Sequence, residues 1–385
     1  MHAMNLDTKL PKVGTTIFSV MSQLAAEHGA INLGQGFPDF PVPDELAQAL
    51  AEAVRAGHNQ YAPSHGIAAL RQAIADLVAE RDSVRIDPDA CITITSGGSE
   101  AILDAVLAVV RPGDEVIVLD PCYDCYEPAI ELAGGVAIHV PLDPASFTVD
   151  WQRVRDAIGP RTRLLMVNTP HNPSGAVLAK ADLDALADIL RDTDVLLLSD
   201  EVYEHMVFDG RRHLGALSHP ELAARAFVVS SFGKTYHCTG WKLGSVIAPP
   251  ALSRELRKVH QYNTFSSFTP AQWAVAHMLT AHPQHHRELP AFYQHKRDAF
   301  RALLAPTALK LLPVAGGYFQ LVDYSALSDL DDAAFCRWLT TEKGVAAIPL
   351  SPFYADPPVG QRLARLCFAK HAETLEAAAR RLRTP

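Results

Sequence analysis

The chain has 385 residues, of which 48% are hydrophobic and 20% are charged, and its net charge is −9. This composition is typical of a globular protein, and the length predicts two or three domains. The acidic balance disfavours nucleic-acid binding, which needs a basic surface, and no run of Lys and Arg predicts binding to a membrane surface.

The N-terminal sequence MHAMNLDTKLPKVG lacks the apolar core of a signal peptide. The longest apolar runs are short, and AILDAVLAVV carries Asp104. That run therefore predicts a helix packed inside the protein and not a membrane span. We expect a cytoplasmic protein whose six cysteines are reduced.

Apolar runs alternate with helical patterns through the middle of the chain. The runs predict strands at 91–95, 114–120, 162–168, 194–200 and 226–231. Helices are predicted at 99–110 and 181–192. This alternation indicates an α/β fold with a mostly parallel sheet between helices, and the nearly continuous apolar strands indicate burial on both faces.

After about residue 285 the pattern changes to that of a smaller α+β region. A long helix is predicted at 289–304, and shorter strand and helix patterns continue to a last helix at 374–383. We therefore expect three parts. They are an N-terminal segment, 1–40, packing with the small domain, a large domain, 41–285, and a small domain, 286–385.

In an open α/β sheet, ligands bind beyond the carboxyl ends of the strands, so the residues after each predicted strand are candidates. The segment SGGSEA (96–101) follows the first strand and opens a helix. Its backbone N–H groups and the helix dipole favour a phosphate or carboxylate. A simple turn with Ser99 near the helix start is an equal alternative.

The segment PCYDCYEP (121–128) follows the second strand. Tyr123 is a candidate to lie flat against a planar ligand, or else it packs in the core. Cys122 and Cys125 form a C-x-x-C pair, but no second pair completes a zinc site, so a metal or redox role is disfavoured. Neither this pair nor Cys238 receives a role.

The next two strand ends carry an amide and a carboxylate. Asn172, in TPHNPSG (169–175), either points its amide towards a ligand or stabilises its own turn. Asp200 ends a fully apolar strand, where a carboxylate needs a cationic partner. That partner is either an arginine elsewhere or the protonated ring nitrogen of a bound heterocycle.

Lys234 lies in SSFGKTYHCTGWKLG (230–244), just after the last of these strands. A buried ammonium is costly unless it is paired or has become an imine. Ser231 and Lys234 also form S-x-x-K, but the S-D-N and K-T-G motifs of serine β-lactamases are absent. Together the strand ends offer a phosphate site, an aromatic face, an amide, a carboxylate and an amine, which is the set that pyridoxal 5′-phosphate (PLP) requires.

The motifs NTPHNPSG, SDEVYEH and SSFGKTYHCTGWK, in this order and spacing, resemble the class I PLP-dependent aminotransferases of fold type I. The resemblance covers essentially the whole chain. Four further segments most resemble the glutamine transaminase and kynurenine aminotransferase branch, to which bacterial methionine aminotransferases belong. These segments are INLGQGFPDF (31–40), NQYAPSHG (59–66), VAAIPLSPFY (345–354) and RLCFAK (365–370).

The resemblance implies a role for each candidate residue. Lys234 would form the imine with PLP and move the proton, while Asp200 would pair with the ring nitrogen. Tyr203 and Asn172 would contact the phenolic oxygen, and Tyr123 would stack on the ring. The phosphate would be held by Gly98, Ser99, Ser231 and Lys242, together with Tyr61 of the partner subunit in a homodimer. Lys242 stands where many relatives have Arg, and it keeps the positive charge.

The resemblance also implies that Arg365 binds the substrate α-carboxylate, with Gly36 and Asn172, although a solvated role for this arginine is the alternative. Apolar and aromatic side chains are candidates for the rest of the pocket: Ile17, Phe18, Tyr61 and Phe353. No second arginine for a side-chain carboxylate is identified. We expect transfer of the amino group of methionine, and secondarily of aromatic amino acids, glutamine or histidine, to a 2-oxo acid, in a ping-pong reaction through pyridoxamine phosphate.

Two other functions are kept as alternatives. A PLP-dependent β-lyase acting on cysteine conjugates would use the same Lys234 and Asp200. A non-catalytic regulator with this fold is disfavoured, because the chain shows neither an added DNA-binding module nor a basic face. Three histidines, His282, His285 and His286, are expected at a solvated helix end and not in a metal site.

Overall fold

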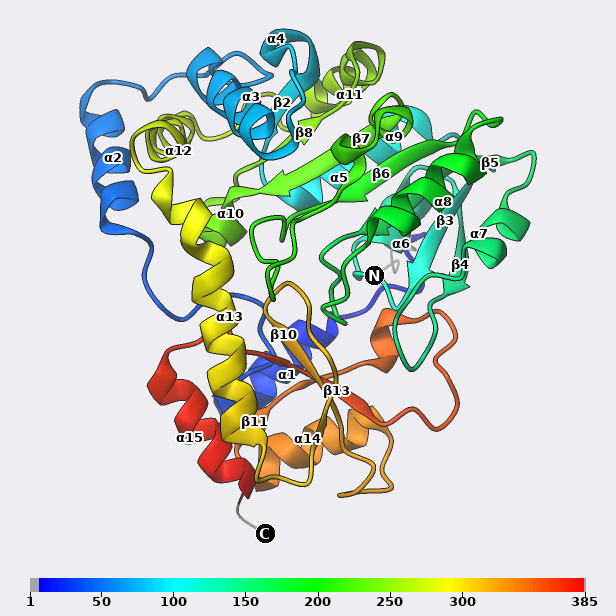
Figure 1. Cartoon of the computed structure of the whole chain (residues 1–385), viewed down its shortest axis with the longest axis vertical. Helices are drawn as coiled ribbons and strands as arrows, with labels where there is room; N and C mark the ends of the chain where they lie inside the picture. The colour runs from blue at the N-terminus through cyan, green and yellow to red at the C-terminus, as the bar shows by residue number, and fades with distance from the viewer. Residues whose placement is uncertain (1–6, 384–385) are drawn as a thin grey trace, which may run out of the picture.

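A seven-stranded sheet forms the centre of the computed structural model, which describes residues 7–383. The strand order is β2-β8-β7-β6-β5-β3-β4. The strands are β2 (Ile92–Thr95), β3 (Glu115–Asp120), β4 (Val136–Pro141), β5 (Thr162–Asn168), β6 (Leu196–Asp200), β7 (Ala226–Ser231) and β8 (Gly244–Ile247). Helices cover both faces of this sheet, as Figure 1 shows.

The sheet is mostly parallel, which confirms the predicted α/β fold class. Strands β4, β3, β5, β6 and β7 run parallel to one another, whereas β8 is antiparallel to both of its neighbours, β7 and β2. The five predicted strands are all present, within two residues at each end. Strands β4 and β8 were not predicted, because β4 is a partly exposed edge strand and β8 is a short GSVI run.

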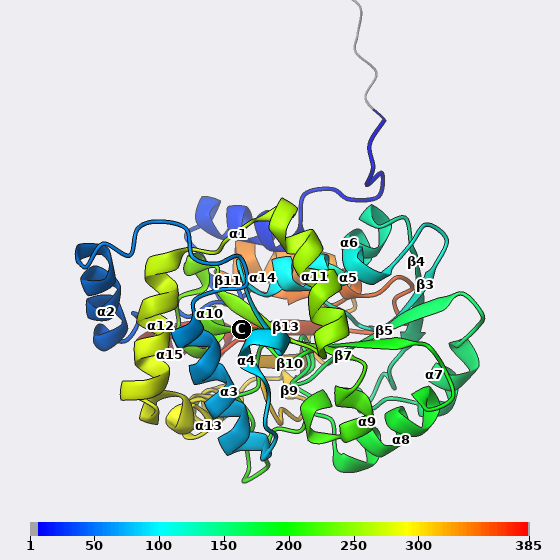
Figure 2. The same cartoon turned by 90° about the horizontal axis from the view of Figure 1, so that it is seen from above.

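Alternate residues of the strands pack against different helices. One face of the sheet packs on α5 (Gly98–Val109), α6 (Tyr126–Leu132) and α11 (Pro250–Asn263). The other face packs on a core that includes α3 (Ala68–Asp82), α8 (Lys180–Leu190) and α12 (Thr269–Ala281). Figure 2 shows α5, α6 and α11 on one side of the strands and α8 on the other. Burial on both faces explains the continuous apolar runs in the sequence.

The C-terminal part contains a second, four-stranded sheet with the order β12-β13-β10-β9, whose outer strands are β12 (Ile348–Pro349) and β9 (Lys310–Leu311). Its central pair, β10 (Phe319–Asp323) and β13 (Leu363–Cys367), is antiparallel. Three helices surround it, namely α13 (Gln284–Leu304), α14 (Asp332–Glu342) and α15 (Ala372–Arg383). Between residues 7 and 383, no helix has the length and apolar character needed to cross a membrane.

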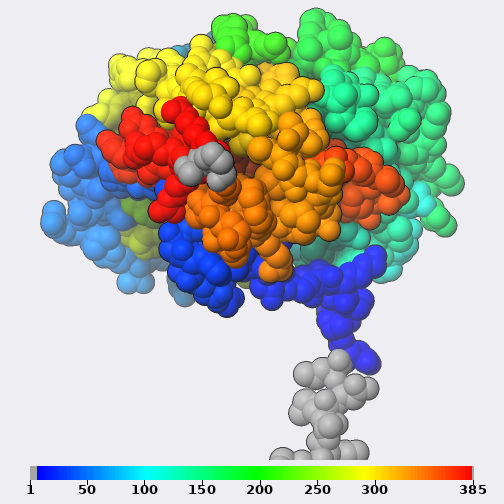
Figure 3. Space-filling view, turned by 90° about the horizontal axis from the view of Figure 1, so that it is seen from below, coloured from blue at the N-terminus to red at the C-terminus, as the bar shows by residue number. Residues whose placement is uncertain are grey.

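The N-terminal segment contains a helix that the sequence patterns did not predict. This helix, α1 (Ile17–Glu27), starts after Thr16, whose hydroxyl accepts a hydrogen bond from the backbone N–H of Ser19. The following strand, β1 (Ile31–Asn32), pairs in parallel with β11 (Val345–Ala346), and Figure 3 shows the N-terminal segment beside the C-terminal helices. We propose the domain division 1–40, 41–285 and 286–385, in which the second boundary falls in the first turn of α13.

Candidate active site

The carboxyl ends of β5, β6 and β7 border one cavity of about 430 Å³, which also touches the N-terminal segment and the small sheet. Every predicted catalytic, cofactor-binding and substrate-binding residue except Tyr61 lines this cavity, whereas two of the further pocket candidates, Ile17 and Phe353, do not. The predicted residues that line it are Phe18, Gly36, Gly98, Ser99, Tyr123, Asn172, Asp200, Tyr203, Ser231, Lys234, Lys242 and Arg365. The fold thus brings together positions from almost the whole length of the chain.

Lys234 projects from α10 (Phe232–Thr235), the single turn of helix that follows β7. Its Nζ donates hydrogen bonds to the Tyr318 hydroxyl at 2.9 Å and to the Gly36 carbonyl at 3.1 Å. Both acceptors are neutral, and burial lowers the pKa of Lys234 to about 8. A substantial fraction of this amine is therefore neutral near physiological pH, as nucleophilic attack on a carbonyl group requires.

Asp200 ends β6 and is buried in the wall of the cavity. The Tyr126 hydroxyl donates to its Oδ2 at 2.6 Å, and the backbone N–H of Val202 donates to Oδ1 at 3.3 Å. Burial raises the pKa of Asp200 to about 6, although the hydrogen bond from Tyr126 opposes the rise. No arginine or lysine of residues 7–383 forms an ion pair with this carboxylate. The carboxylate is therefore available to pair with a cationic group of a ligand in the cavity.

One corner of the cavity, at the start of α5, presents backbone N–H groups and the ammonium group of Lys242, and we call it the phosphate corner. Gly97 precedes the helix with φ of 87°, a conformation that glycine adopts without steric cost, and a Cβ there would lie 3.3 Å from Cε of Lys242. Ser99 and Ser231 line the same cavity. The start of a twelve-residue helix, a lysine and two hydroxyls together form a binding site for an anion such as phosphate.

Arg365, on β13, is almost completely buried and lies against the opposite side of the cavity. Its Nη1 donates to Oδ1 of Asn172 and its Nη2 to the Gly34 carbonyl, both at 2.8 Å, while the Phe319 ring lies 4.0 Å from the guanidinium carbon. Its Nε has no hydrogen-bond partner. This burial excludes the alternative of a solvated arginine and leaves a cation that a carboxylate ligand would satisfy.

Two aromatic side chains complete the wall near Lys234 and Asp200. Tyr203 packs edge-on against Tyr318, and Lys234 Nζ lies 5.7 Å from the centre of the Tyr203 ring. Tyr123 packs edge-on against Tyr126 on the side of Asp200. Both positions are compatible with the predicted contacts to a flat ligand, and the roles themselves stay predictions.

Tyr61 lies away from the cavity of its own chain. Its side chain is 81% exposed, and its ring packs edge-on against Phe265 at 5.2 Å between centroids. A role in the site of the same subunit is therefore excluded by its position, and a role across a subunit interface stays a prediction.

The sequence analysis did not identify three polar residues of the site. Tyr126 donates to Asp200, Tyr318 accepts from Lys234, and Asn168 orders the loop after β5. The Asn168 side chain donates to the Asp200 carbonyl at 2.9 Å and accepts from the backbone N–H of Asn172 at 2.7 Å. Only Asn168, at the end of a predicted strand, had a recognisable signal, because a buried tyrosine in a core pattern reads as packing.

Two expectations about neighbouring residues are wrong. Ile17 and Phe353 do not line the cavity, and Phe353 instead packs against Phe18 with 5.9 Å between ring centroids. The predicted solvated helix end is also wrong for two of the three histidines. His286 is buried, and His285 donates to the Thr235 carbonyl at 2.8 Å, because α13 packs here against the segment after β7.

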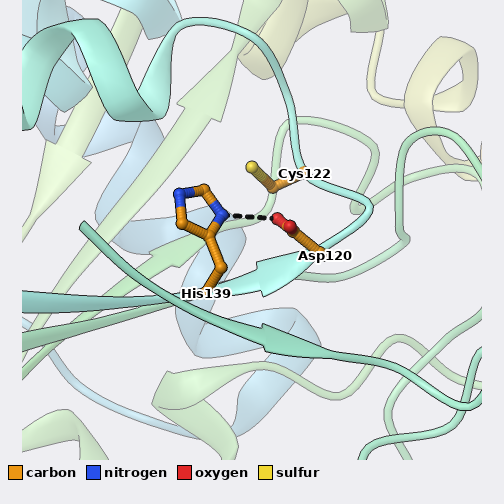
Figure 4. Close-up of side chains that lie close together, drawn as sticks. All are labelled: Asp120, Cys122 and His139. Atoms are coloured by element: carbon orange, nitrogen blue, oxygen red, sulfur yellow. Dashed lines mark hydrogen bonds and ion pairs between the residues drawn. The ribbon is translucent and has the colours of Figure 1, made fainter. Parts of the chain in front are cut away.

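The C-x-x-C pair flanks Tyr123 of the cavity, and burial favours the protonated form of its thiols. Figure 4 shows Cys122 next to the hydrogen bond between His139 and Asp120, which is 2.9 Å long. Burial raises the pKa of the thiols of both Cys122 and Cys125 well above the usual value. The second oxygen of Asp120 accepts from the backbone N–H of Ala355. A thiolate nucleophile or redox centre is therefore disfavoured at this position.

The donor set of the cavity fits PLP. The start of α5 with Lys242 suits the phosphate, and Asp200 suits a protonated ring nitrogen. Lys234 has no carboxylate partner in residues 7–383 and suits the aldehyde. The unpartnered Nε of Arg365 suits the carboxylate of an amino acid.

Comparison with known proteins agrees with this geometry. The family described as aminotransferase class I and II matches residues 28–382. The chain is 54% identical over 376 residues to the methionine aminotransferase of Escherichia coli (strain K12), covering 98% of this chain and 97% of that protein. It is 35% identical to kynurenine–oxoglutarate transaminase 1 of Homo sapiens, covering 94% and 93%.

A solved structure supports the same relationship. The crystal structure of an Escherichia coli protein for which a methionine aminotransferase function was identified has a TM-score of 0.97 with this chain, at 53% identity and 99% coverage of both chains. The chain therefore belongs to the class I and II aminotransferases, PLP-dependent enzymes of fold type I that act on amino acids and 2-oxo acids.

Proposed function

We propose that this aminotransferase uses methionine as its preferred amino donor, with aromatic amino acids and glutamine as secondary donors. The observation that carries the proposal is the lining of the cavity. Arg365 is its one arginine within the described chain, and Phe18, Phe37 and Phe319 supply apolar surface. The similarity to an enzyme named methionine aminotransferase and to kynurenine–oxoglutarate transaminases supports the same preference.

The charges of the cavity support a neutral side chain on the substrate. If Arg365 binds the α-carboxylate, an acidic side chain needs another cation. The two lysines of the cavity, Lys234 and Lys242, are assigned to the aldehyde and the phosphate. A side-chain carboxylate would then be desolvated without a partner, whereas the thioether of methionine pays no such penalty and packs well against aromatic rings.

When bound, PLP supplies an electron sink for the negative charge that develops at the substrate Cα. In its neutral form, Lys234 is the base that takes the proton from Cα and later returns it. Asp200, as an anion, keeps the ring nitrogen protonated, and Tyr126 fixes the position of this carboxylate. Arg365 and Asn172 orient the amino acid through its carboxylate, with the Gly36 backbone beside them.

The remaining predicted residues hold the cofactor. Tyr203 and Asn172 contact the phenolic oxygen, and Tyr123 stacks on the ring. The start of α5, with Gly98 and Ser99, binds the phosphate together with Ser231 and Lys242. Their common position on one cavity supports this division of roles.

We also propose a homodimer in which Tyr61 reaches the phosphate of the partner subunit. Tyr61 packs against the exposed Phe265, and two further exposed aromatic side chains, Tyr262 and Phe268, lie on α11 and in the segment that follows it. Exposed aromatic clusters of this kind are typical of protein interfaces and are otherwise unfavourable on a surface. The cytoplasmic location stays a prediction from the sequence.

Purified enzyme tests this function directly. With 2-oxo acid acceptors in excess, we expect kcat/KM for methionine to exceed that for aspartate by about a hundredfold, since an unpaired buried carboxylate costs several kcal/mol. Equal values for the two donors would refute the preference. With cysteine conjugates, release of pyruvate and ammonia in place of amino transfer would instead identify the β-lyase alternative.

A further inference from the structure

A buried cluster of charged side chains lies beside the phosphate corner of the cavity. Glu100 and Asp104 lie one turn apart on α5, and His260 of α11 lies against both of them. Nδ1 of His260 donates to Oε1 of Glu100 at 2.6 Å, and Oδ2 of Asp104 lies 3.3 Å from the same nitrogen. Figure 2 shows α5 and α11 side by side.

The second nitrogen of His260 contacts another segment. Nε2 donates to the Ser64 carbonyl at 2.7 Å. A carbonyl oxygen and an ionised carboxylate only accept hydrogen bonds, so both ring nitrogens carry a proton and the ring is an imidazolium. Burial opposes this charge, but the adjacent carboxylates of Asp104 and Glu100 raise the pKa of His260 to about 9.

Ser64 belongs to the segment that presents Tyr61 to solvent. In this segment, the backbone N–H of Ala62 donates to the Thr269 hydroxyl at 3.1 Å, and the Ser266 hydroxyl donates to the Ala62 carbonyl at 3.1 Å. The backbone next to Tyr61 is thus held by the contacts of Ala62. Three residues after Tyr61, it is held by the hydrogen bond from His260 to the Ser64 carbonyl. All of these contacts come from its own chain.

Glu100 belongs to the start of α5, where the phosphate is expected. It follows Ser99 directly, and its other carboxylate oxygen accepts a hydrogen bond from the backbone N–H of Ser96. Oδ1 of Asp104 accepts from the Asn263 amide at 2.8 Å, whereas Oδ2 has no hydrogen-bond partner. Two carboxylates near a bound phosphate would repel it, and a neighbouring cation cancels that repulsion.

We propose that His260 is a positioning residue that holds both the phosphate site of its own subunit and the Tyr61 segment that serves the partner subunit. The second half of this inference rests on the proposed homodimer and the proposed role of Tyr61. The imidazolium neutralises Glu100 and Asp104. His65, the remaining ionisable group of the segment beside it, stays neutral because burial lowers its pKa.

A metal ion is a poorer occupant of this cluster. Glu100, Asp104 and His260 each offer one atom within 4.8 Å of the others. Two ligands of a tetrahedral zinc ion lie about 3.3 Å apart, because each bond is about 2 Å long. The 2.6 Å between His260 Nδ1 and Glu100 Oε1 is instead the length of a charge-assisted hydrogen bond.

Titration of PLP into the cofactor-free enzyme tests the role in phosphate binding. We expect His260→Gln to weaken PLP binding about tenfold, because two carboxylates remain without their cation. Glu100→Gln in the same chain should restore much of this loss. His286→Gln is the matched control, since His286 is buried on α13 and has no hydrogen-bond partner for its Nδ1. Unchanged affinity in His260→Gln, with normal binding in the wild type, would overturn the inference.

Hybrid dimers separate the two halves of the proposal. One subunit carries Lys234→Ala, so that only the other subunit holds PLP covalently. His260→Gln is then placed either in the subunit with the intact site or in its partner. We expect faster PLP release, measured by the loss of visible absorbance, in both hybrids. An effect confined to one of the two hybrids would refute the double role.

A third measurement covers the case in which His260→Gln does not fold. PLP release from the wild type should accelerate as the pH rises through about 9, where His260 loses its charge. Asp104→Asn should shift this midpoint to lower pH, because loss of an adjacent anion lowers the pKa of His260. An unshifted midpoint, or a metal ion found by elemental analysis, would overturn the inference. Failure of the wild type to bind PLP at Lys234 would instead refute the proposed function.

Discussion

The hydroxyl of Tyr126 lies 2.6 Å from Oδ2 of Asp200. Within residues 7–383, the hydrogen bond that a side chain donates to this carboxylate comes from Tyr126. Asp200 sits at the end of a buried strand, where burial raises its pKa to about 6. Whether this group is an anion at neutral pH therefore depends on the few groups that donate to it.

Tyr126→Phe should lower activity most at acidic pH. Loss of the hydroxyl raises the pKa of Asp200 further, so a larger part of the enzyme carries a neutral acid that cannot pair with a cationic ring nitrogen. We expect kcat to fall about tenfold near pH 6, with partial recovery as the pH rises and Asp200 ionises. The measurement is the pH profile of kcat. Tyr324→Phe, at a buried tyrosine outside the site, is the control, and an unshifted acidic limb would contradict the prediction.

Asp200→Asn should keep the shape of the site and remove its anion. Asn still accepts a hydrogen bond from Tyr126, but it does not stabilise a positive charge on a ring nitrogen. We expect kcat to fall by at least about a hundredfold, which corresponds to about 2.7 kcal/mol, with a smaller loss of PLP affinity. A variant with normal kcat would show that Asp200 has no role at the cofactor.

Uptake of PLP by the cofactor-free enzyme should accelerate with pH. Burial lowers the pKa of Lys234 to about 8, and only the neutral amine attacks an aldehyde. At pH 6 only about one amine in a hundred is neutral, so the rate should rise steeply up to pH 8 and then level off. Tyr318→Phe should move this rise to lower pH, because it removes an acceptor that stabilises the ammonium form. The measurement is the visible absorbance after rapid mixing, and a pH-independent rate would contradict the assignment.

Arg365→Lys should affect substrate binding more than cofactor binding. Lysine keeps the charge but loses the planar fork that binds a carboxylate through two hydrogen bonds. We expect KM for the amino acid to rise about a hundredfold with a smaller change in kcat. Arg362→Lys, three residues earlier and paired with Asp329, is the matched control. Loss of PLP from Arg365→Lys would show that this residue serves the cofactor.

Tyr61→Phe should speed up the release of PLP without changing the stability of the cofactor-free protein. The hydroxyl is exposed in the single chain, so its removal costs no internal contact. If it donates to the phosphate of the partner subunit, the release rate should increase about tenfold. Tyr262→Phe, at a similarly exposed tyrosine, is the control. Equal release rates for the two variants would argue against the role of Tyr61.

The ends of the central strands were predictable because their signals are local. An apolar run that stops at Asp200, or a lysine just after AFVVSS, identifies a polar group at the edge of a buried sheet. Apart from Phe18, the predicted residues that line the cavity were found from such strand ends or from motifs that resemble the family.

The residues missed by sequence analysis depend on long-range packing. Tyr126 and Tyr318 act through hydroxyls that meet Asp200 and Lys234, 74 and 84 positions away in the chain. Nothing in a local pattern distinguishes such a tyrosine from one that only packs. The same applies to His260, whose partners come from α5 and from the segment around Ser64.

The pairing of β1 with β11 has a consequence for folding during synthesis on the ribosome. Ile31 and Asn32 have to wait for Val345 and Ala346, more than three hundred residues later, before their strand acquires its neighbour. Phe18 and Gly36 likewise meet Arg365 only when translation is nearly finished. In the nascent chain, the N-terminal segment therefore lacks its packing partners. The PLP site cannot form until synthesis is almost complete.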